Sequence, residues 1–518
     1  MVFNSLAFLL FFPLVAAVYF FLTMRIALRH QTLSTALSQI FLLVASLFFY
    51  GYWNPAYLGL ILISITVTWV SGLLMEGREV QKKRLILAGS LVINLGILFF
   101  FKYYHFAINS IRFFAHDKVT FPSFDVLLPV GISFYTFQAL GYSIDVYYER
   151  VRAERNFITY ALFVTFFPQL VAGPIERTGN LLPQFKVNHE FDYDRVTSGL
   201  RLAAWGMFKK VVIADQLAIY VNGVFGNPVF YPAASLALAV FFFTFQIYCD
   251  FSGYSDIAIG CARVLGFNLM SNFRQPYFSR SITEFWRRWH ISLSTWLKDY
   301  LYIPLGGNRK GEVRRYINLL ITFLISGLWH GAAWHFVVWG ALHGVFQIIG
   351  RSTAPFRNAI GRKVGLPEES RLRKAIQVCV TFTLVYFAWI FFRANTITDA
   401  FLITAKLAEL PAELAGYVRG LSQNGIMTTV RTAFQLRTDV TDPIENFIGL
   451  KFSGLFIAVL LISDGLVRVI PNVDTWIMKK PAVLRWAGYY VLIITILITF
   501  LLNWVSDFGS SQFIYFTF

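Results

Sequence analysis

Three histidines lie in a strongly apolar stretch, where an ionisable side chain is costly. They are His330, His335 and His343 in the segment SGLWHGAAWHFVVWGALHG. An ionisable group inside a membrane is a candidate for function, because its burial must be compensated. Gly327 and Gly331 flank His330 and would let a substrate or a second helix approach it closely. We predict that His330 is catalytic; the alternative is a core histidine with satisfied hydrogen bonds.

An imidazole suits the activation of a hydroxyl group for attack on an acyl donor. A hydroxyl is a weak nucleophile at neutral pH and needs a base within hydrogen-bond reach, and a neutral imidazole can take the proton. The pattern does not indicate a metal site. His330 and His335 lie about 140° apart around a helix, no carboxylate is near them, and HExxH is absent. We expect no metal and no tightly bound cofactor.

A fourth histidine, His290, lies in EFWRRWHISLSTWLKDYLY, residues 284–302. Ser281 and Glu284 form an S-x-x-E capping box, which predicts a helix start. At about 100° per residue, one face carries the large apolar side chains: Phe285, Trp286, Trp289, Leu293, Trp296, Leu297 and Tyr300. This pattern predicts one amphipathic helix at the membrane interface. His290 could point inward as a second catalytic residue, or the segment could be a surface anchor.

Polar residues also follow a spanning run in QIYCDFSGYSDIAIG. They could line a polar tunnel or orient a histidine; a hydrated helix break at Gly253 would explain them equally well. We predict that five residues line a tunnel or the substrate site: Asp250, Tyr254, Asp256, Trp286 and Trp329.

The composition places these residues in a membrane. Of 518 residues, 57% are hydrophobic and 14% are charged, whereas a soluble domain is about one quarter charged. We predict an all-α, polytopic integral membrane protein with about eleven to thirteen membrane-embedded helices. The net charge of +17 indicates basic loops against anionic lipid rather than nucleic-acid binding.

Apolar runs of spanning length follow one another along the whole chain. They cover residues 3–24, 33–52, 55–74, 86–101, 127–147, 157–175, 199–224, 232–249, 317–334, 336–350, 375–392, 452–470 and 486–505. The sequence shows neither an internal repeat nor a low-complexity linker. We predict a single domain over 1–518, with the site in a core of residues 125–350 and C-terminal helices in 375–518.

The basic loops predict the orientation. Loops 25–32, 76–85 and 351–374 are rich in Lys and Arg and should be cytoplasmic, because short cytoplasmic loops carry an excess of positive charge. The N-terminus and residues 395–451 should then face outward.

These residues fit two classes of protein. One is an intramembrane transferase that uses His330 and His290. The other is a proton-coupled transporter with a relay through Asp250, Asp256 and His330. The lack of an inverted repeat favours the transferase.

Four segments resemble the membrane-bound O-acyltransferase (MBOAT) family, in the branch with the membrane subunit of alginate O-acetylation. They are FFPQLVAGPIER (166–177), YCDFSGYSDIAIG (248–260), QPYFSRSITEFWRRWHISLSTWLKDYLYIPLGGNRKG (275–311) and GLWHGAAWHFVVWGALHG (327–344). The resemblance continues to the terminal SQFIYFTF.

The resemblance implies a ring of tilted helices around a funnel or tunnel in a bacterial inner membrane. It also implies an essential histidine at His330 and a second polar site at His290. An acyl thioester such as acetyl-CoA would donate the acyl group from the cytoplasm, and a separate periplasmic or extracellular acetyltransferase would complete O-acetylation of an exported polysaccharide such as alginate. D-alanyl or other acyl transfer to a cell-wall polymer is the alternative within the family.

Overall fold

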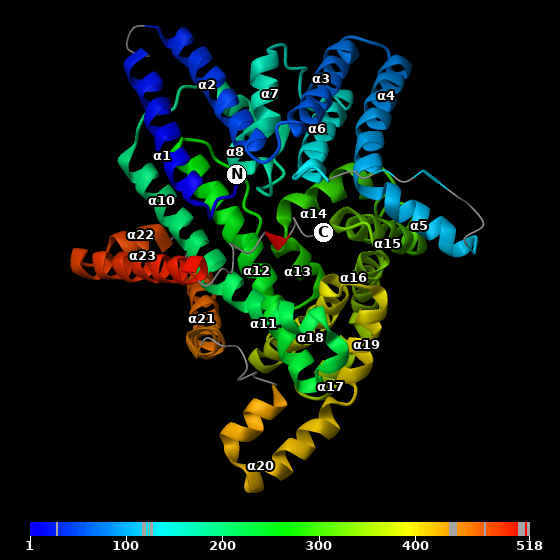
Figure 1. Ribbon diagram of the computed structural model, residues 1–518. Coiled ribbons are helices and arrows are strands. Elements are labelled where there is room, and N and C mark those ends of the chain that lie inside the picture. Colours follow the sequence, from blue (N-terminus) through cyan, green and yellow to red (C-terminus); the bar gives the residue numbers. More distant parts are fainter. Residues whose placement is uncertain are drawn as a thin grey trace. The chain divides into compact units, whose positions relative to one another are not determined.

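The regular structure of this chain is helical. The computed structural model describes residues 1–26, 30–116, 121–122, 124, 128–434, 443–470, 473–505 and 513–514. Within these ranges it contains helices α1 to α23 with short π and 3₁₀ segments, and no strand (Figure 1). The prediction of an all-α protein is confirmed.

The chain forms two compact units. The first contains residues 1–207, 254–272 and 295–301, and the second contains residues 208–253, 273–294 and 302–518. Helices α12 (Ala233–Val264) and α14 (Ile291–Leu297) contribute residues to both units. The prediction of a single domain over 1–518 stays a prediction.

The first unit contains the N-terminal helices. They are α1 (Leu6–Phe21), α2 (Gln31–Gly51), α3 (Tyr57–Met75), α4 (Val80–Leu98), α5 (Tyr104–Phe114), α6 (Ile132–Tyr147), α7 (Phe157–Thr165), α8 (Phe167–Leu170), α9 (Thr178–Leu181) and α10 (Tyr193–Met207). Helices α3, α4 and α6 lie side by side (Figure 1). Ser64 donates to Asn94 across α3 and α4, with 2.6 Å between the oxygens. Such bonds satisfy polar side chains that hydrocarbon could not.

The second unit contains the remaining helices, apart from α14, which the two units share. They are α11 (Asp215–Gly226), most of α12, α13 (Ile282–Arg288), α15 (Gly311–His330), α16 (Trp334–Ser352), α17 (Ala354–Lys363), α18 (Arg371–Arg393), α19 (Ile397–Leu407), α20 (Leu410–Ala433), α21 (Pro443–Val469), α22 (Val473–Met478) and α23 (Ala482–Val505). Helices α15 and α16 form an antiparallel hairpin. A methyl group at Gly327 would overlap the carbonyl oxygen of Phe336, and one at Gly340 would overlap that of Phe323. These glycines therefore allow the close helix contact that places His330 against α16.

Among the described residues, eight helical segments are long and apolar enough to cross a membrane. They are Leu6–Met24, Gln31–Gly51, Tyr57–Met75, Val80–Phe114, Ala233–Val264, Arg371–Arg393, Phe452–Val469 and Ala482–Asn503. The prediction of a multi-pass membrane protein is confirmed, whereas the count of eleven to thirteen embedded helices stays a prediction.

One predicted span does not form a continuous helix. The run 157–175 contains α7, which ends at Thr165, and the four-residue α8. Pro168 has no N–H to donate to the carbonyl four residues earlier, which favours the end of α7 before it. At the break, the amide of Phe167 donates to the hydroxyl of Ser46 on α2, 3.1 Å away. The apolar run 157–175 is therefore not one continuous helix.

Candidate functional site

His290 lies at a break between two short helices. Helix α13 ends at Arg288 and α14 begins at Ile291, and His290 has a φ of 42°, in the left-handed region. That conformation is uncommon for a residue with a Cβ and is found where surrounding contacts impose it. The prediction of one continuous amphipathic helix over 284–302 was therefore wrong. The break leaves His290 fully buried, with 0% of its surface exposed.

The predicted start of this segment is confirmed. The Ser281 hydroxyl accepts a hydrogen bond from the amide of Glu284, with 3.1 Å between oxygen and nitrogen. In a standard capping box the Glu284 carboxylate would accept a hydrogen bond from the amide of the N-cap residue, Ser281. Here it accepts from the amide of Arg280 instead, at 2.9 Å. The bond from Ser281 supplies one of the partners that the first turn of α13 needs.

The aromatic face of the segment lies inside the protein rather than in lipid. Trp289 is 1% exposed, and its ring centroid lies 5.0 Å from that of Phe273 and 5.2 Å from that of Trp389. Within the first unit, Trp296 stacks on Phe137 at 4.0 Å and donates to its carbonyl. The apolar side chains were identified correctly, but the reading as a surface anchor was wrong, because these rings form core contacts.

His330 is the last residue of α15 and is 3% exposed. Aromatic rings surround its imidazole, with centroids at 4.9 Å for Trp329, 5.0 Å for Trp339 and 5.3 Å for Phe392. Gly331 turns the chain into an extended conformation, and a methyl group there would overlap the ring of Phe336. The glycine thus permits the sharp turn directly after the histidine.

The second unit brings the two predicted catalytic histidines together. The imidazole centroids of His290 and His330 lie 6.3 Å apart. Trp329, predicted as a lining residue, contacts both rings, at 5.7 Å from His290 and 4.9 Å from His330. Burial lowers the pKa of His290 to about 3, because charging an imidazole away from water is unfavourable. His290 is therefore neutral at physiological pH and can accept or donate a hydrogen bond.

A third histidine, His343, extends this cluster. It is 0% exposed, and its Nδ1 accepts a hydrogen bond from Nε1 of Trp286 at 3.2 Å. This bond requires a lone pair on Nδ1, so the neutral ring carries its proton on Nε2. Trp339 lies against both His343, at 4.9 Å, and His330, at 5.0 Å. Trp286, a predicted lining residue, contacts His343 and Trp339, with ring centroids 5.1 and 5.8 Å away. Trp339 in turn contacts His330.

Sequence reasoning missed Trp339. The available signal was the spacing of the small residues Gly327 and Gly340, which pair across the α15–α16 hairpin. His335, on the same hairpin, has a separate role. Its Nδ1 lies 2.9 Å from the carbonyl oxygen of Phe391 on α18, which fits a structural histidine.

Asp250 belongs to a buried ion cluster. The Lys210 ammonium lies 2.6 Å from one carboxylate oxygen of Asp250 and 2.9 Å from the carboxylate of Asp215. The other oxygen of Asp250 accepts a hydrogen bond from the amide of Ile514 at 2.7 Å. The signal for this partner was Lys210 itself, a basic residue within an apolar run. The lining role predicted for Asp250 stays a prediction.

Tyr254 and Asp256 belong to the first unit. The ring of Tyr254 stacks on that of Phe3 with centroids 4.4 Å apart, and Asp256 is half-buried. Their predicted lining role stays a prediction.

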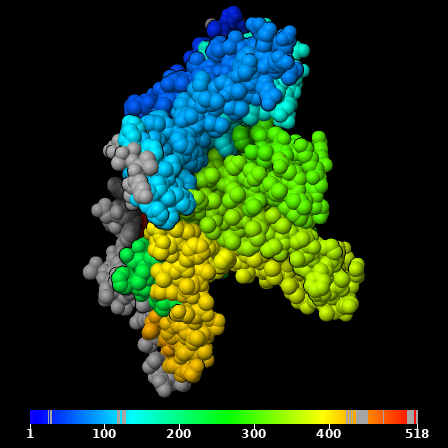
Figure 2. All heavy atoms as spheres, turned by 90° about the vertical axis from the view of Figure 1, so that its right-hand side faces the viewer, coloured from blue at the N-terminus to red at the C-terminus, as the bar shows by residue number. Residues whose placement is uncertain are grey.

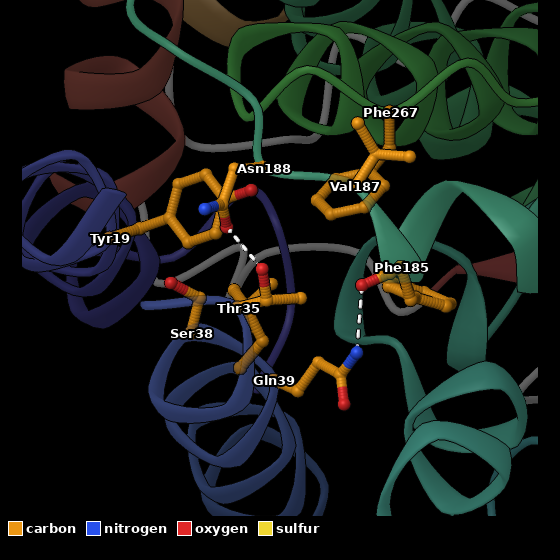
Figure 3. A pocket seen from close by; sticks show the side chains of 9 residues that line it. Tyr19, Thr35, Ser38, Gln39, Phe185, Val187, Asn188 and Phe267 are labelled. Atoms are coloured by element: carbon orange, nitrogen blue, oxygen red, sulfur yellow. Dashed lines mark hydrogen bonds between the residues drawn. The ribbon is translucent and has the colours of Figure 1, made fainter. Parts of the chain in front are cut away.

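The first unit also contains a small recess next to α1 and α2 (Figure 3). Two of its polar side chains are hydrogen-bonded: Thr35 donates to Asn188 at 2.9 Å, and Gln39 donates to the carbonyl of Phe185 at 2.8 Å. The remaining lining residues are Tyr19, Ser38, Leu42, Val187 and Phe267. This lining contains neither a histidine nor a carboxylate, so it offers no general base of those types.

Across the described part of the chain, no group of three or more His, Cys, Asp or Glu side chains could hold a metal ion. The histidines of the second unit are surrounded by aromatic rings, and such rings are not metal ligands. The expectation of chemistry without a metal stays a prediction.

Known proteins resemble this chain over most of its length. Residues 148–394 match the model of the membrane-bound O-acyltransferase family. The "probable alginate O-acetylase AlgI" of Pseudomonas putida is 42% identical over 77% of this chain and 78% of its own length. The peptidoglycan O-acetyltransferase of Helicobacter pylori is 36% identical over 76% of this chain and 80% of its own. The teichoic acid D-alanyltransferase of Streptococcus thermophilus is 26% identical over 51% of this chain and 68% of its own.

This chain therefore belongs to the membrane-bound O-acyltransferase family. It is a multi-pass membrane enzyme of the O-acyltransferase class, and the resemblance inferred from its motifs is confirmed.

Proposed function

We propose that this enzyme takes an acetyl group from a cytoplasmic thioester, such as acetyl-CoA, and passes it across the membrane for O-acetylation of an exported polysaccharide such as alginate. The proposal is supported by the relatives named as alginate O-acetylase and peptidoglycan O-acetyltransferase. One structural observation carries it: the imidazole centroids of His290 and His330 lie 6.3 Å apart in a buried aromatic environment.

His330 acts as the general base in this reaction. The acceptor hydroxyl attacks the thioester carbonyl while the imidazole takes its proton, and the thiolate leaves and receives a proton in turn. General-base assistance typically contributes about a hundred- to ten-thousand-fold in rate. The rings of Trp329, Trp339 and Phe392 around His330 exclude water that would compete with the acceptor.

His290 provides the second polar contact. Because it is neutral, it can donate a hydrogen bond to one substrate and accept one from another. Its ring is held by edge contacts with Phe251 at 4.6 Å and Trp329 at 5.7 Å. This fixed position suits a residue that orients the acyl group beside His330.

The reaction connects the two sides of a bacterial inner membrane. The thioester enters from the cytoplasm, and the N-terminus faces outward, as the basic loops predict. A separate periplasmic or extracellular acetyltransferase then completes transfer to the polysaccharide, either directly or through a further carrier.

Acetyl transfer is favoured over the two alternatives. The D-alanyltransferase relative is 26% identical over half of this chain, whereas the alginate O-acetylase relative is 42% identical over 77%. Family membership disfavours a proton-coupled transporter. In addition, Asp250, which the transporter would need for its proton relay, forms an ion pair with Lys210 and accepts a hydrogen bond from the Ile514 amide.

Purified protein in liposomes, supplied with labelled acetyl-CoA, tests the proposal. We expect release of free thiol and transfer of the label to an acceptor hydroxyl. The His330→Ala variant should lose both, and His335→Ala is the matched control on the same hairpin. Ion flux without label transfer would support the transporter and contradict the proposal.

A further inference from the structure

The helix that follows α16 carries an exposed apolar stripe. Phe356 is 68% exposed, Ile360 is 44% exposed and Val364, directly after α17, is 61% exposed. These positions are four residues apart, so they lie along one side of the helix. In Figure 2 the yellow-green atoms of this segment lie on the visible surface. Such a stripe in water would be unfavourable.

Basic side chains border the stripe. At about 100° per residue, Arg357 lies on one side of it and Lys363 on the other, and both are exposed. The whole segment 351–374 has seven basic residues against two acidic ones, Glu368 and Glu369. An apolar stripe between cations is complementary to an anionic lipid interface.

The opposite side of α17 is attached to the protein by a buried guanidinium. Arg373, at the start of α18, is 8% exposed and donates to the carbonyl of Leu366 at 3.1 Å and to the side chain of Asn358. Gly361 faces the same group, and a methyl group there would lie 2.6 Å from its nitrogen. The inner face of α17 is therefore built for this contact, which leaves the apolar stripe turned outward.

The stripe adjoins a membrane-spanning helix. Helix α18 is one of the segments able to cross a membrane, and its first turns expose Leu372 at 60%, Ile376 at 46% and Val380 at 54%. Helix α17 is only ten residues long, too short to span hydrocarbon itself. A short amphipathic helix next to the end of a membrane-spanning helix lies at the level of the lipid headgroups.

We propose that α17 lies in the plane of the membrane, with Phe356, Ile360 and Val364 among the acyl chains and Arg357, Arg362 and Lys363 on anionic headgroups. The enzyme would then contact negatively charged lipid at the entry to α18. This role is independent of acyl transfer and of which side of the membrane carries the loop.

Site-directed spin labelling in reconstituted full-length protein tests this. Cys379→Ser removes the exposed native thiol, and Cys249 and Cys261 are buried. A nitroxide at Ile360→Cys reports the stripe, and one at Glu368→Cys, exposed in the turn after α17, is the matched control. Collisions with lipid-soluble oxygen and with a water-soluble nickel chelate are compared in vesicles of phosphatidylglycerol with phosphatidylcholine.

We expect the oxygen-to-nickel collision ratio to be at least about fivefold higher at position 360 than at position 368, as for a helix sunk into the interface. In phosphatidylcholine alone the ratio at 360 should fall several-fold, and an Arg357→Gln, Arg362→Gln, Lys363→Gln variant should show the lower value in both vesicles. Equal ratios at 360 and 368 would place α17 in water and overturn the proposal. So would a label at 360 that is shielded from both reagents, as by a protein partner. A ratio that does not depend on anionic lipid would overturn the role of the charges.

Discussion

The imidazoles of His290 and His330 lie with their centroids 6.3 Å apart, although forty positions separate them in the chain. His290 reaches this place through a left-handed backbone conformation at the break between α13 and α14, and His330 through its position at the end of α15. The two imidazoles therefore lie within one enclosure of aromatic rings, with Trp329 against both.

His330→Ala should abolish acetyl transfer while leaving expression and membrane insertion normal. Loss of a general base lowers the rate by about a hundred- to ten-thousand-fold, whereas removal of an imidazole at a helix end leaves the hairpin contacts in place. His335→Ala and His343→Ala should be milder. Acetylation by properly inserted His330→Ala protein at more than a few per cent of the parent rate would contradict the mechanism.

His290→Ala should lower transfer strongly without removing the protein from the membrane. The buried rings of Phe285 and Trp289 hold α13 in place, and their burial outweighs that of one imidazole. Labelled acetyl incorporation and the amount of protein in the membrane fraction check this. Full activity of the variant would show that His290 is structural only.

Trp286→Phe should reduce activity through His343. The substitution keeps an aromatic ring but removes the N–H that donates to Nδ1 of His343. A buried acceptor left without a partner costs about 1–3 kcal/mol, and His343 contacts Trp339, which in turn contacts His330. Melting temperature and transfer rate should both fall. Trp486→Phe, at a 56% exposed position, is the control, and equal behaviour of the two variants would rule out this chain of contacts.

Lys210→Met should destabilise the protein markedly. The substitution leaves the buried carboxylates of Asp215 and Asp250 without their cation, and removal of one partner of a buried pair typically costs about 3–5 kcal/mol. The melting temperature of solubilised protein reports this. Lys82→Met breaks an exposed pair with Glu79 and should cost less than about 1 kcal/mol. A Lys210→Met protein as stable as the parent would show that the cluster is not held as described.

Gly340→Ala should impair activity, because the added methyl group would overlap the carbonyl oxygen of Phe323 and push α15 away from α16. His330 and Trp339 would then lose their contact. Gly350→Ala on the same helix meets nothing within 4 Å and should be neutral or slightly stabilising, since alanine favours a helix by roughly 0.5–1 kcal/mol over glycine. The test compares the acetyl-transfer rates of the two variants at equal expression. Equal rates would contradict tight packing at Gly340.

The orientation in the membrane can be tested by labelling from outside in a Cys379→Ser background. Cysteines at position 80 or 363 should resist an impermeant thiol reagent in intact cells and react after permeabilisation, because the basic loops 76–85 and 351–374 are predicted to be cytoplasmic. A cysteine placed at an exposed position in 395–434 should react without permeabilisation. Labelling of position 80 or 363 in intact cells would overturn the predicted topology.

The sequence by itself determined the class of fold and singled out the candidate site residues. Hydrophobic composition and apolar runs are local properties, and they predicted a helical membrane protein. The cost of an ionisable group in an apolar environment identified His330 from its neighbours alone, and the S-x-x-E pattern located the start of α13 at Ser281. These inferences needed only the residue types and their spacing.

Only the tertiary structure decided how these residues meet. The helical period continues through His290, so nothing in the local pattern predicts the break. At the break, Trp289 packs against Phe273 and against Trp389 on α18, contacts that the sequence does not show. Trp339 joins His330 to His343 because two glycines pair across a hairpin. The ion pair of Asp250 with Lys210, forty positions earlier, likewise could not be read from the local pattern. The physical reason is the same in each case: periodicity fixes which face of a helix is apolar, but burial of that face against distant helices determines which side chains touch.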